Sequence, residues 1–483
     1  MLRNYFKVAF RYLAKHKGYT VINILGLAVG IASCILVMIF VRSEWSFDRF
    51  HSKSDRIHRA WLQEFYQGEI FTNVVTPLPL GAVLQDNLAE VETTCRVYAF
   101  NALTKYNNTT FNDPVNMVDS SFFNIFDFPL KEGDIRNPFP TPNSIIISPA
   151  TAKKYFGNET PVGKTLSLQL SNDEVLFTVS GVTNNIPVAS SIQFAMLISF
   201  SNAPRFFSQN ALTKAWSNVA VETYILLKKG TTTAVTDSKI PAVLQPLVAK
   251  NYKPGEYNVR LQPMSDIHLN NTLPAGNQPI SDPKYSYILG TIGILILLIA
   301  CVNFVTLSIG RSTTRALEVG IRKVLGAGRQ QLIRQYWGEA LMLSFFSLVT
   351  GILLAIVLVK PFNQLADRQL SIPFDSFTFL FYFLIVTVIG LTAGIYPAVV
   401  LSGFKPIQVL KGKLKAGTKM DFLGKALVTG QFVASIIMII ATITIGKQLD
   451  YMRTKDLGYN KDHIIIIPTN KPRLEGNRLA ARF

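Results

Sequence analysis

Residues 21–41 read VINILGLAVGIASCILVMIFV, an apolar stretch that contains no Lys, Arg, Asp or Glu. A helix of this length crosses the hydrocarbon core of a bilayer, which needs about 20 residues at about 1.5 Å each. Four later stretches share these properties: 287–309, 340–359, 377–401 and 426–445. They predict the fold class of a membrane protein with an α-helical bundle of five transmembrane spans.

Basic residues are concentrated in three short segments next to these spans. Residues 1–18, 310–339 and 402–425 together hold 17 Lys or Arg and only 3 Asp or Glu, and the 483-residue chain has a net charge of +18. Short positive segments stay on the cytoplasmic side. We therefore expect a multi-pass protein of the plasma (inner) membrane with a cytoplasmic N-terminus and with residues 43–284 outside the cytoplasm. Because anionic lipid explains the charge, no nucleic-acid partner is expected.

The first 18 residues carry a further pattern. Arg3, Lys7, Arg11 and Lys15 recur at every fourth position, with apolar residues between them. This spacing predicts an amphipathic helix in the inner leaflet, and the alternative is a plain positive flank for the first span, residues 19–42. Both interpretations place the segment in the cytoplasm.

Residues 43–284 form a large insert between the first two spans. Short stretches rich in Val and Ile predict strands, and segments such as 79–91 have helical spacing. Cys95 is the only cysteine of the insert, so no disulfide can form within it. We expect a large α+β extracytoplasmic domain of two subdomains that is held together by an apolar core.

Two patterns in the insert raise the question of chemistry. FGNETPVGKT is similar to a phosphate-binding loop, but one residue too many separates its two glycines. Asp48, His51, Asp55 and His58 would share one face of a continuous helix and could ligate zinc, but the basic residues among them favour a solvated linker. We therefore expect no catalytic residue, no metal and no cofactor in this chain, which is not predicted to be an enzyme.

Small residues recur within the spans. Gly26 and Gly30, and then Gly390 and Gly394, form GxxxG pairs, which let two helix backbones approach closely in lipid. The alternative is that glycine is simply common in membrane helices. The spans contain no ionisable residue that could relay protons or bind a coupling ion, which disfavours an ion pump or a secondary transporter.

The cytoplasmic loop 310–336 has the most specific pattern. Its first part predicts a short, charged, amphipathic helix, which the glycines at 326 and 328 end. The candidate coupling residues of this helix are Leu317, Glu318, Ile321, Arg322, Lys323 and Leu325. A helix of this kind suits a groove in a partner protein, and the alternative is a positive loop that rests on the membrane.

The same loop carries a family resemblance. EVGIRKVLGAGRQQLIRQYWGEAL resembles the loop between the second and third helices of the FtsX/MacB-like permeases of type VII ABC transporters. VDSSFFNIFDFPLKEGD, SIIISPATAKKYFGNETPVGKTL and VSGVTNNIP resemble the extracytoplasmic domain of the MacB-like group, in that order. The N-terminal FRYLAKHKGYTVINILGLAVGIASCILV is similar to the two-copy permeases of Bacteroidetes-type bacteria. The resemblance covers residues 1–470.

The resemblance implies a mechanism and a set of partners. In this family, separate cytoplasmic ABC ATPase subunits bind ATP and draw two membrane halves together, and long helices transmit that motion to extracytoplasmic domains. The implied partners are an ATPase subunit, a second permease half or a homodimer partner, and periplasmic or outer-membrane components. Residues 311–332 match the segment that contacts the ATPase. The implied activity is efflux or extracytoplasmic substrate handling, with the substrate left open.

The end of the chain departs from this pattern. Relatives with this N-terminus carry two copies of the arrangement, whereas here the basic linker 402–425 and the fifth span, 426–446, lead only into the start of a second outside domain, 447–483. We expect a truncated product or a fragment. The rival function is a membrane sensor or scaffold that regulates a cell-envelope partner without ATP-driven work, which the spans after residue 340 and the patterned loop disfavour.

Overall fold

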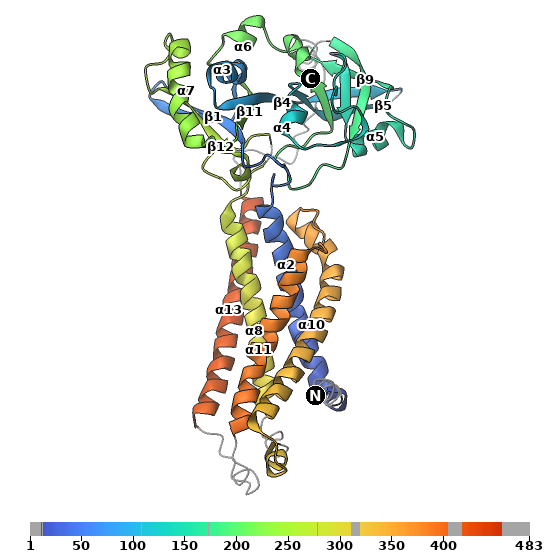
Figure 1. Ribbon diagram of the computed structural model, residues 1–483, viewed down its shortest axis with the longest axis vertical. Helices are drawn as coiled ribbons and strands as arrows, with labels where there is room; N and C mark the ends of the chain where they lie inside the picture. The colour runs from blue at the N-terminus through green and yellow to red at the C-terminus, as the bar shows by residue number, and fades with distance from the viewer. Residues whose placement is uncertain are drawn as a thin grey trace. The chain divides into compact units, whose positions relative to one another are not determined.

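The structure is a computed structural model that describes residues 11–455 apart from residues 12, 108, 172, 278, 311–318 and 404–417. The chain divides into two compact units. A helical unit contains the chain up to Arg42 and again from Lys284, and an α/β domain contains Ser43–Pro283 (Figure 1).

The described part of the helical unit contains five long helices. They are α2 (Lys17–Trp45), α8 (Pro283–Gly310), α10 (Arg329–Ala366), α11 (Ser376–Gly403) and α13 (Thr418–Thr454). All except α11 contain a described stretch that is long and apolar enough to cross a membrane. The side chains of α11 are described only in part beyond Thr392, so its assignment as a span stays a prediction. The fold is nevertheless that of a membrane protein with several apolar helices.

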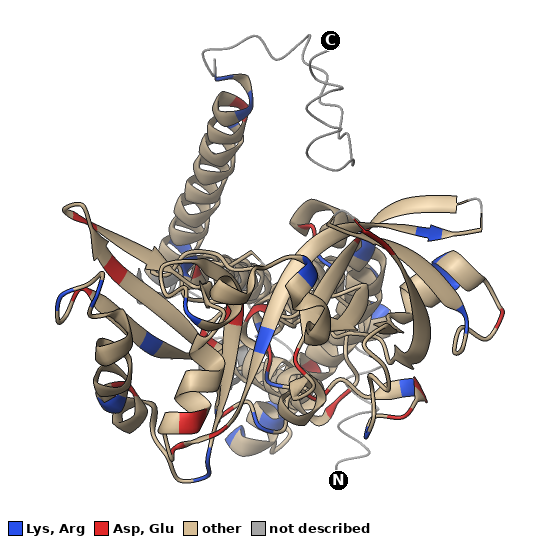
Figure 2. Ribbon diagram, turned by 90° about the horizontal axis from the view of Figure 1, so that it is seen from above, with Lys and Arg blue, Asp and Glu red and all other residues tan. Residues whose placement is uncertain are grey.

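The helices α2, α8, α10 and α11 share an apolar core. Ile31 of α2, Phe304 of α8, Leu343 of α10 and Ile389 of α11 are all at most 4 % exposed and belong to one cluster. In contrast, the described side chains of the apolar stretch of α13 are not buried by the rest of the chain. Figure 2 shows that this helix carries charge only towards its ends, as expected of a helix whose middle is covered by lipid or by another protein.

The α/β domain is built on one sheet, to which twelve described strands contribute. The strands are β1 (Ile57–Tyr66), β2 (Glu69–Asn73), β3 (Thr76–Pro77), β4 (Val91–Tyr106), β5 (Thr109–Val118), β6 (Leu130–Gly133), β7 (Ser144–Ile147), β8 (Thr165–Leu170), β9 (Asp173–Thr183), β10 (Met196–Ser199), β11 (Val219–Leu227) and β12 (Tyr257–Pro263). The order along the sheet is β12-β1-β11-β4-β5-β10-β7-β9-β6, with β2, β3 and β8 off this path.

Helices cover this sheet near both of its ends (Figure 1). Near β12, α3 (Leu80–Asn87) and α7 (Thr233–Val248) pack their leucines against β1 and β11 in one apolar cluster. Near β9, α5 (Pro149–Phe156) joins a second cluster around Phe177. The strands β4 and β5 are hydrogen-bonded to each other and join the part of the sheet near β12 to the part near β9. The strand pairing therefore marks no boundary between two subdomains. The domain also contains the short helices α4 (Phe122–Ile125) and α6 (Gln209–Thr213) and the 3-10 helices η1 (Phe200–Arg205) and η2 (Met264–Asp266).

Candidate functional site

We name residues 319–332, the described part of the predicted coupling loop, the coupling segment. It consists of a short helix, a tight turn and the first residues of α10. Its first helix ends in a Schellman motif, in which the Ala327 N–H donates to Arg322 O at 2.9 Å and the Gly326 N–H donates to Lys323 O at 3.1 Å. Gly326 has a φ of +93°, a left-handed conformation that costs a residue with a Cβ much more than it costs glycine. The first predicted glycine therefore ends the helix through its backbone freedom.

The coupling segment is fixed to the start of α10. Gly328 precedes this helix, and its N–H donates to the Gln331 side chain at 3.2 Å, which is half of a capping box. Val319, Leu332 and Tyr336 form a small buried cluster in which Val319 is only 1 % exposed. The short helix is therefore packed back against α10 and is held in one orientation.

Three apolar side chains of the coupling segment remain exposed. Ile321, Val324 and Leu325 are 48 %, 63 % and 81 % exposed, and their spacing of three and four residues places them on one face of the helix. Arg322 beside them donates a hydrogen bond to Gln335 of α10. A mixed apolar and basic face of this kind is what a partner groove would cover.

The structure shows the surroundings of four of the predicted coupling residues, and their contact with an ATPase stays a prediction. Leu317 and Glu318 lie outside the described residues. Ile321 and Leu325 lie on the exposed apolar face, and Arg322 and Lys323 are half-buried beside it. The sequence analysis missed Val324, although its position three residues after Ile321 was the available signal. It also missed that Val319 points inward to Leu332.

Three of the four predicted glycines, all except Gly26, lie at points of close helix approach. A Cβ on Gly30 would lie 2.8 Å from the Cβ of Ala300 in α8, and a Cβ on Gly26 would lie 3.5 Å from Nδ2 of Asn303. Real Cβ contacts are essentially never shorter than 3.0 Å. At Gly30, therefore, α2 and α8 are as close as a glycine permits.

The second pair seats α11 against α10. A Cβ on Gly390 would lie 2.5 Å from Cδ2 of Leu341, and a Cβ on Gly394 would lie 2.6 Å from Cδ1 of Trp337. Gly351 of α10, which the sequence analysis did not select, approaches Ile31 of α2 in the same way. Its signal was present in the sequence, because Ser347 and Ala355 are small residues four positions before and after it.

Polar side chains are buried where the chain enters and leaves the α/β domain. We name Glu44, Asp48, His51, Arg59, Glu222 and His268 the connector residues, because they hold the segments that follow α2 and precede α8. Nε2 of His268 lies 3.1 Å from Oε2 of Glu44, and the two side chains are 4 % and 1 % exposed. The His268 ring also stacks on Phe47, with 3.4 Å between ring centroids. The two ends of the domain are thus joined to each other.

Asp48 fixes the turn after α2. Its φ of +58° is left-handed, a conformation that Asp tolerates better than most residues with a side chain. Its N–H donates to Ala189 O at 3.0 Å, and its Oδ1 accepts the Ser191 N–H at 2.7 Å. Burial raises the pKa of Asp48, and the hydrogen bonds from Ser191 oppose that shift.

His51 is enclosed by the aromatic rings of Phe50, Phe126 and Phe128. Its Nδ1 accepts a hydrogen bond from the Asp127 N–H at 3.0 Å. Burial lowers the pKa of His51 to about 4, and the Asp127 charge opposes the shift only in part. The ring is therefore neutral at physiological pH, as an acceptor requires.

These positions correct the interpretation of this stretch as a solvated linker for three of its four residues. Asp48, His51 and His58 are at most 3 % exposed, because each fills a separate polar position in the domain. Nε2 of His58 faces Thr233 at 2.7 Å, away from the other two. Asp55 is exposed, as that interpretation predicts. The described residues contain no group of three or more His, Cys, Asp or Glu that could hold a metal ion.

The buried pair Arg59 and Glu222 holds the segment before α8. The guanidinium lies 3.4 Å from Glu222 Oε1 and donates to Oε1 of Gln262 at 2.8 Å. Glu222 also accepts the N–H of Asn277 at 2.9 Å. A Cβ on Gly276 would lie only 2.6 Å from the guanidinium, so only glycine lets this segment lie directly on the pair.

The stretch similar to a phosphate loop is part of the sheet framework. Gly157 ends α5 with a φ of +61°, and the Gly163 N–H donates to Val179 O at 2.8 Å. A strand, β8, follows the second glycine where a phosphate loop requires the start of a helix.

Comparisons with known proteins match both units. Residues 20–243 match the family model of the MacB-like periplasmic core domain, and residues 290–406 match that of the FtsX-like permease C-terminal region. The pyoverdine export ATP-binding/permease protein PvdT of Pseudomonas syringae pv. syringae is 24 % identical over 370 residues, which are 72 % of this chain and 51 % of that protein. The macrolide export ATP-binding/permease protein MacB of Haemophilus ducreyi is 23 % identical over 84 % of this chain and 55 % of its own length.

Among solved structures, a permease-protein domain from Porphyromonas gingivalis is 19 % identical with a TM-score of 0.40, and covers 50 % of this chain and 98 % of its own. The periplasmic region of MacB from Actinobacillus actinomycetemcomitans is 13 % identical with a TM-score of 0.33, and the match covers 44 % of this chain and 90 % of that structure. The chain spans about half the length of the curated relatives that it matches. The two family matches, which together cover most of the chain, show that it belongs to the FtsX/MacB-like ABC permeases.

Proposed function

We propose that this chain is the permease subunit of an ABC transporter and that it transmits ATP-driven motion from cytoplasmic ATPase subunits to its α/β domain. The domain would then act on a substrate outside the cytoplasm, by efflux or by another form of extracytoplasmic handling. In this account the ATPase subunit binds the ATP, and the chain itself carries no catalytic residue. The N-terminus and the coupling segment lie in the cytoplasm.

The observation that carries this proposal is the exposed apolar face of the coupling segment. Ile321, Val324 and Leu325 lie on a helix that is held against α10 by Val319 and Leu332. A rigid, exposed apolar face transmits force better than a mobile loop would, because a push on it displaces α10 rather than only the loop. Arg322 and Lys323 on the same helix suit an acidic rim on the ATPase.

Membrane partners are part of the proposal. The apolar stretch of α13 is at most half-buried by the rest of the chain among its described side chains, which leaves much of its surface for a second permease half or for a homodimer partner. Glycine contacts such as that of Gly30 with Ala300 would keep α2 and α8 moving together. Periplasmic or outer-membrane components would complete the assembly on the other side.

The test is co-purification of the full chain with an ABC ATPase subunit from native membranes. Ile321→Glu places a charge in the apolar face, and Glu318→Lys reverses a charge at its predicted edge. We expect Ile321→Glu to lower the recovered ATPase at least about tenfold, because a buried charge at an interface is costly. Gln448→Glu is the matched control, since it adds the same charge at an exposed position of α13, outside the coupling segment, without removing an apolar side chain.

The outcomes separate the proposal from its rival. Loss of the ATPase with Ile321→Glu, weakening with Glu318→Lys and retention with Gln448→Glu support the coupling role. If the wild-type chain brings down no ATPase, or if both coupling variants bind as well as wild type, the coupling role is wrong. A sensor or scaffold that works through the α/β domain would then be the better account.

A further inference from the structure

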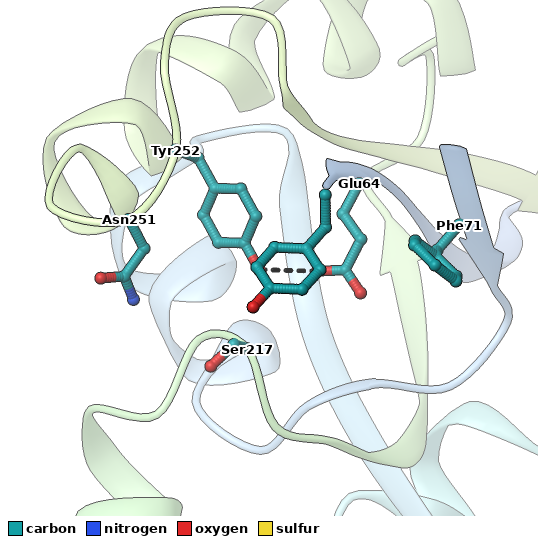
Figure 3. Close-up of a pocket in the computed structure, with 6 residues that line it drawn as sticks. Glu64, Phe71, Ser217, Asn251 and Tyr252 are labelled. Carbon is teal, nitrogen blue, oxygen red and sulfur yellow. Dashed lines mark hydrogen bonds between the residues drawn. The ribbon is translucent and has the colours of Figure 1, made fainter. Parts of the chain in front are cut away.

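A pocket of about 590 Å³ opens on the α/β domain beside the hairpin of β1 and β2. Its lining residues are Glu64, Tyr66, Phe71, Ser217, Asn251 and Tyr252 (Figure 3). None of them belongs to the coupling segment or to the connector residues. We propose that this pocket binds an organic ammonium group through the Glu64 carboxylate and the aromatic rings around it.

The register of the hairpin builds one wall of the pocket. Glu64 of β1 and Phe71 of β2 are directly opposite each other, and Tyr66 follows Glu64 by two residues. Because side chains alternate between the two faces of a strand, these three project on the same face. Tyr66 and Phe71 are 55 % and 43 % exposed, so both rings are accessible to a ligand beside the carboxylate.

The opposite wall is rigid. The Tyr252 hydroxyl donates to Oε2 of Glu64 at 2.7 Å, as Figure 3 shows, and its ring lies 5.0 Å from that of Tyr257. Tyr257 in turn donates its hydroxyl to Trp216 O at 3.0 Å. Burial raises the pKa of Tyr252, so the phenol stays protonated and orients the carboxylate without neutralising it.

The charge of the pocket selects its ligand. Glu64 is its only charged lining residue, and none of the ion pairs between described residues includes Glu64. A single carboxylate is too few ligands for a divalent metal, and it repels anions. A carboxylate flanked by aromatic faces instead attracts an alkylated ammonium group. The positive charge interacts with the carboxylate and with the aromatic faces, and the alkyl carbons pack against the rings. Ser217 and Asn251 supply hydrogen-bonding groups at the rim.

Two sources carry this chemistry: a small quaternary or primary ammonium compound, and a lysine side chain of a peptide. The full chain in lipid nanodiscs is titrated by calorimetry with choline and, separately, with its neutral isostere 3,3-dimethylbutan-1-ol. A second pair of titrations uses acetyl-Leu-Lys-Leu-amide and the same peptide with norleucine in place of lysine. We expect the cationic member of at least one pair to bind about tenfold or more tightly than the neutral member.

Variants locate the binding in this pocket. Glu64→Gln and Tyr66→Ala should each weaken binding of the cation about tenfold. Phe65→Ala is the control for Tyr66→Ala, because the neighbouring residue projects on the other face of the hairpin. Asp86→Asn is the control for Glu64→Gln, since it removes a carboxylate from the exposed surface of α3. Thermal unfolding of each variant shows whether the domain is intact.

Preference for choline points to a small cation, and preference for the lysine peptide points to a peptide ligand; both support the proposal. The proposal is wrong if the wild-type chain binds no cation more tightly than its neutral counterpart. It is equally wrong if Glu64→Gln, correctly folded, binds as tightly as wild type. The first comparison needs no variant, so it decides the matter even if the variants fail to fold.

Discussion

The coupling segment and the connector residues depart from the usual pattern of protein interiors and surfaces in opposite ways. The coupling segment exposes apolar side chains, among them Leu325 at 81 % exposure. The connector residues bury charged or titratable ones, among them Glu44 and Arg59 at 1 % and 2 % exposure. The coupling segment gains no free energy from burying these apolar side chains within the chain. The connector residues lose free energy when their charges are desolvated, and their ion-pair and hydrogen-bond partners offset that loss.

The difference teaches what each region is for. An exposed apolar face gains free energy only when another protein covers it, so the coupling segment is suited to an interaction that forms and changes. Buried ion pairs and hydrogen bonds have strict geometry, so the connector residues hold the entry and exit of the domain in one arrangement. In the proposed mechanism, the coupling segment receives the motion of the ATPase. The connector residues keep the entry and exit of the α/β domain from deforming, so that the domain moves as a whole.

The largest effect is expected from Arg59→Met. It leaves the Glu222 carboxylate buried without its cation and should lower the free energy of unfolding of the α/β domain by about 4 kcal/mol. Urea unfolding of the detergent-solubilised chain measures this. The double variant Arg59→Met/Glu222→Gln removes the orphaned charge and should recover more than half of the loss. Equal destabilisation of both variants would mean that the pair is not the connection described here.

A smaller effect is expected from the titration of His51. Its pKa is about 4 in the folded domain and about 6.5 for an ordinary histidine in an unfolded chain, so the unfolded chain takes up the proton first as the pH falls. Stability contributed by the neutral ring is therefore present above pH 6.5 and is lost between pH 6.5 and 4, by about 3 kcal/mol in total.

Urea unfolding of the full chain at pH 7 and at pH 4 measures this loss. His51→Gln keeps an acceptor for the Asp127 N–H but cannot take up a proton, so it should remove most of this part of the pH dependence. His58→Gln, at a separate buried position, should leave the His51 contribution in place. A pH profile of His51→Gln that matches wild type would contradict the burial described for this ring.

The smallest effect is expected in the coupling segment. Leu325→Ser replaces an exposed apolar side chain, so the free energy of unfolding should change by less than about 0.5 kcal/mol while ATPase recovery falls. Chemical unfolding and co-purification of the same preparation measure both. A loss of stability comparable with that of Arg59→Met would show that Leu325 packs within the chain, and the contrast between the two regions would disappear.

Much of this arrangement could be predicted from the sequence where one periodic signal dominates. The apolar stretches predicted the helices that contain Ile31 and Leu343, because about 20 apolar residues in a row, without a charged residue, are typical of a transmembrane helix. The break at Gly326 and the exposure of Ile321 and Leu325 follow from local backbone rules and helical spacing. The family resemblance, which rests on several separate motifs, is confirmed by matches to both units.

The rest depends on contacts between residues far apart in the chain. His51 was assigned to a solvated linker because its neighbours are charged, and the rings that bury it come from residues 126 and 128. Glu222 meets Arg59 only through the order of strands β1 and β11. The pocket at Glu64 was missed for the same reason, since Tyr252 reaches it from the loop after α7. Local pattern carries no information about such pairs.

The most direct measurement of the central claim is the side of the membrane on which each region lies. In a background with Cys34, Cys95 and Cys301 replaced by Ala, single cysteines are introduced by Val324→Cys in the coupling segment and by Asp86→Cys in α3. A membrane-impermeant maleimide is added to right-side-out vesicles. The account predicts labelling of Asp86→Cys in intact vesicles and of Val324→Cys only after permeabilisation. Labelling of both without permeabilisation would contradict it, because no motion could then be transmitted across the bilayer between them.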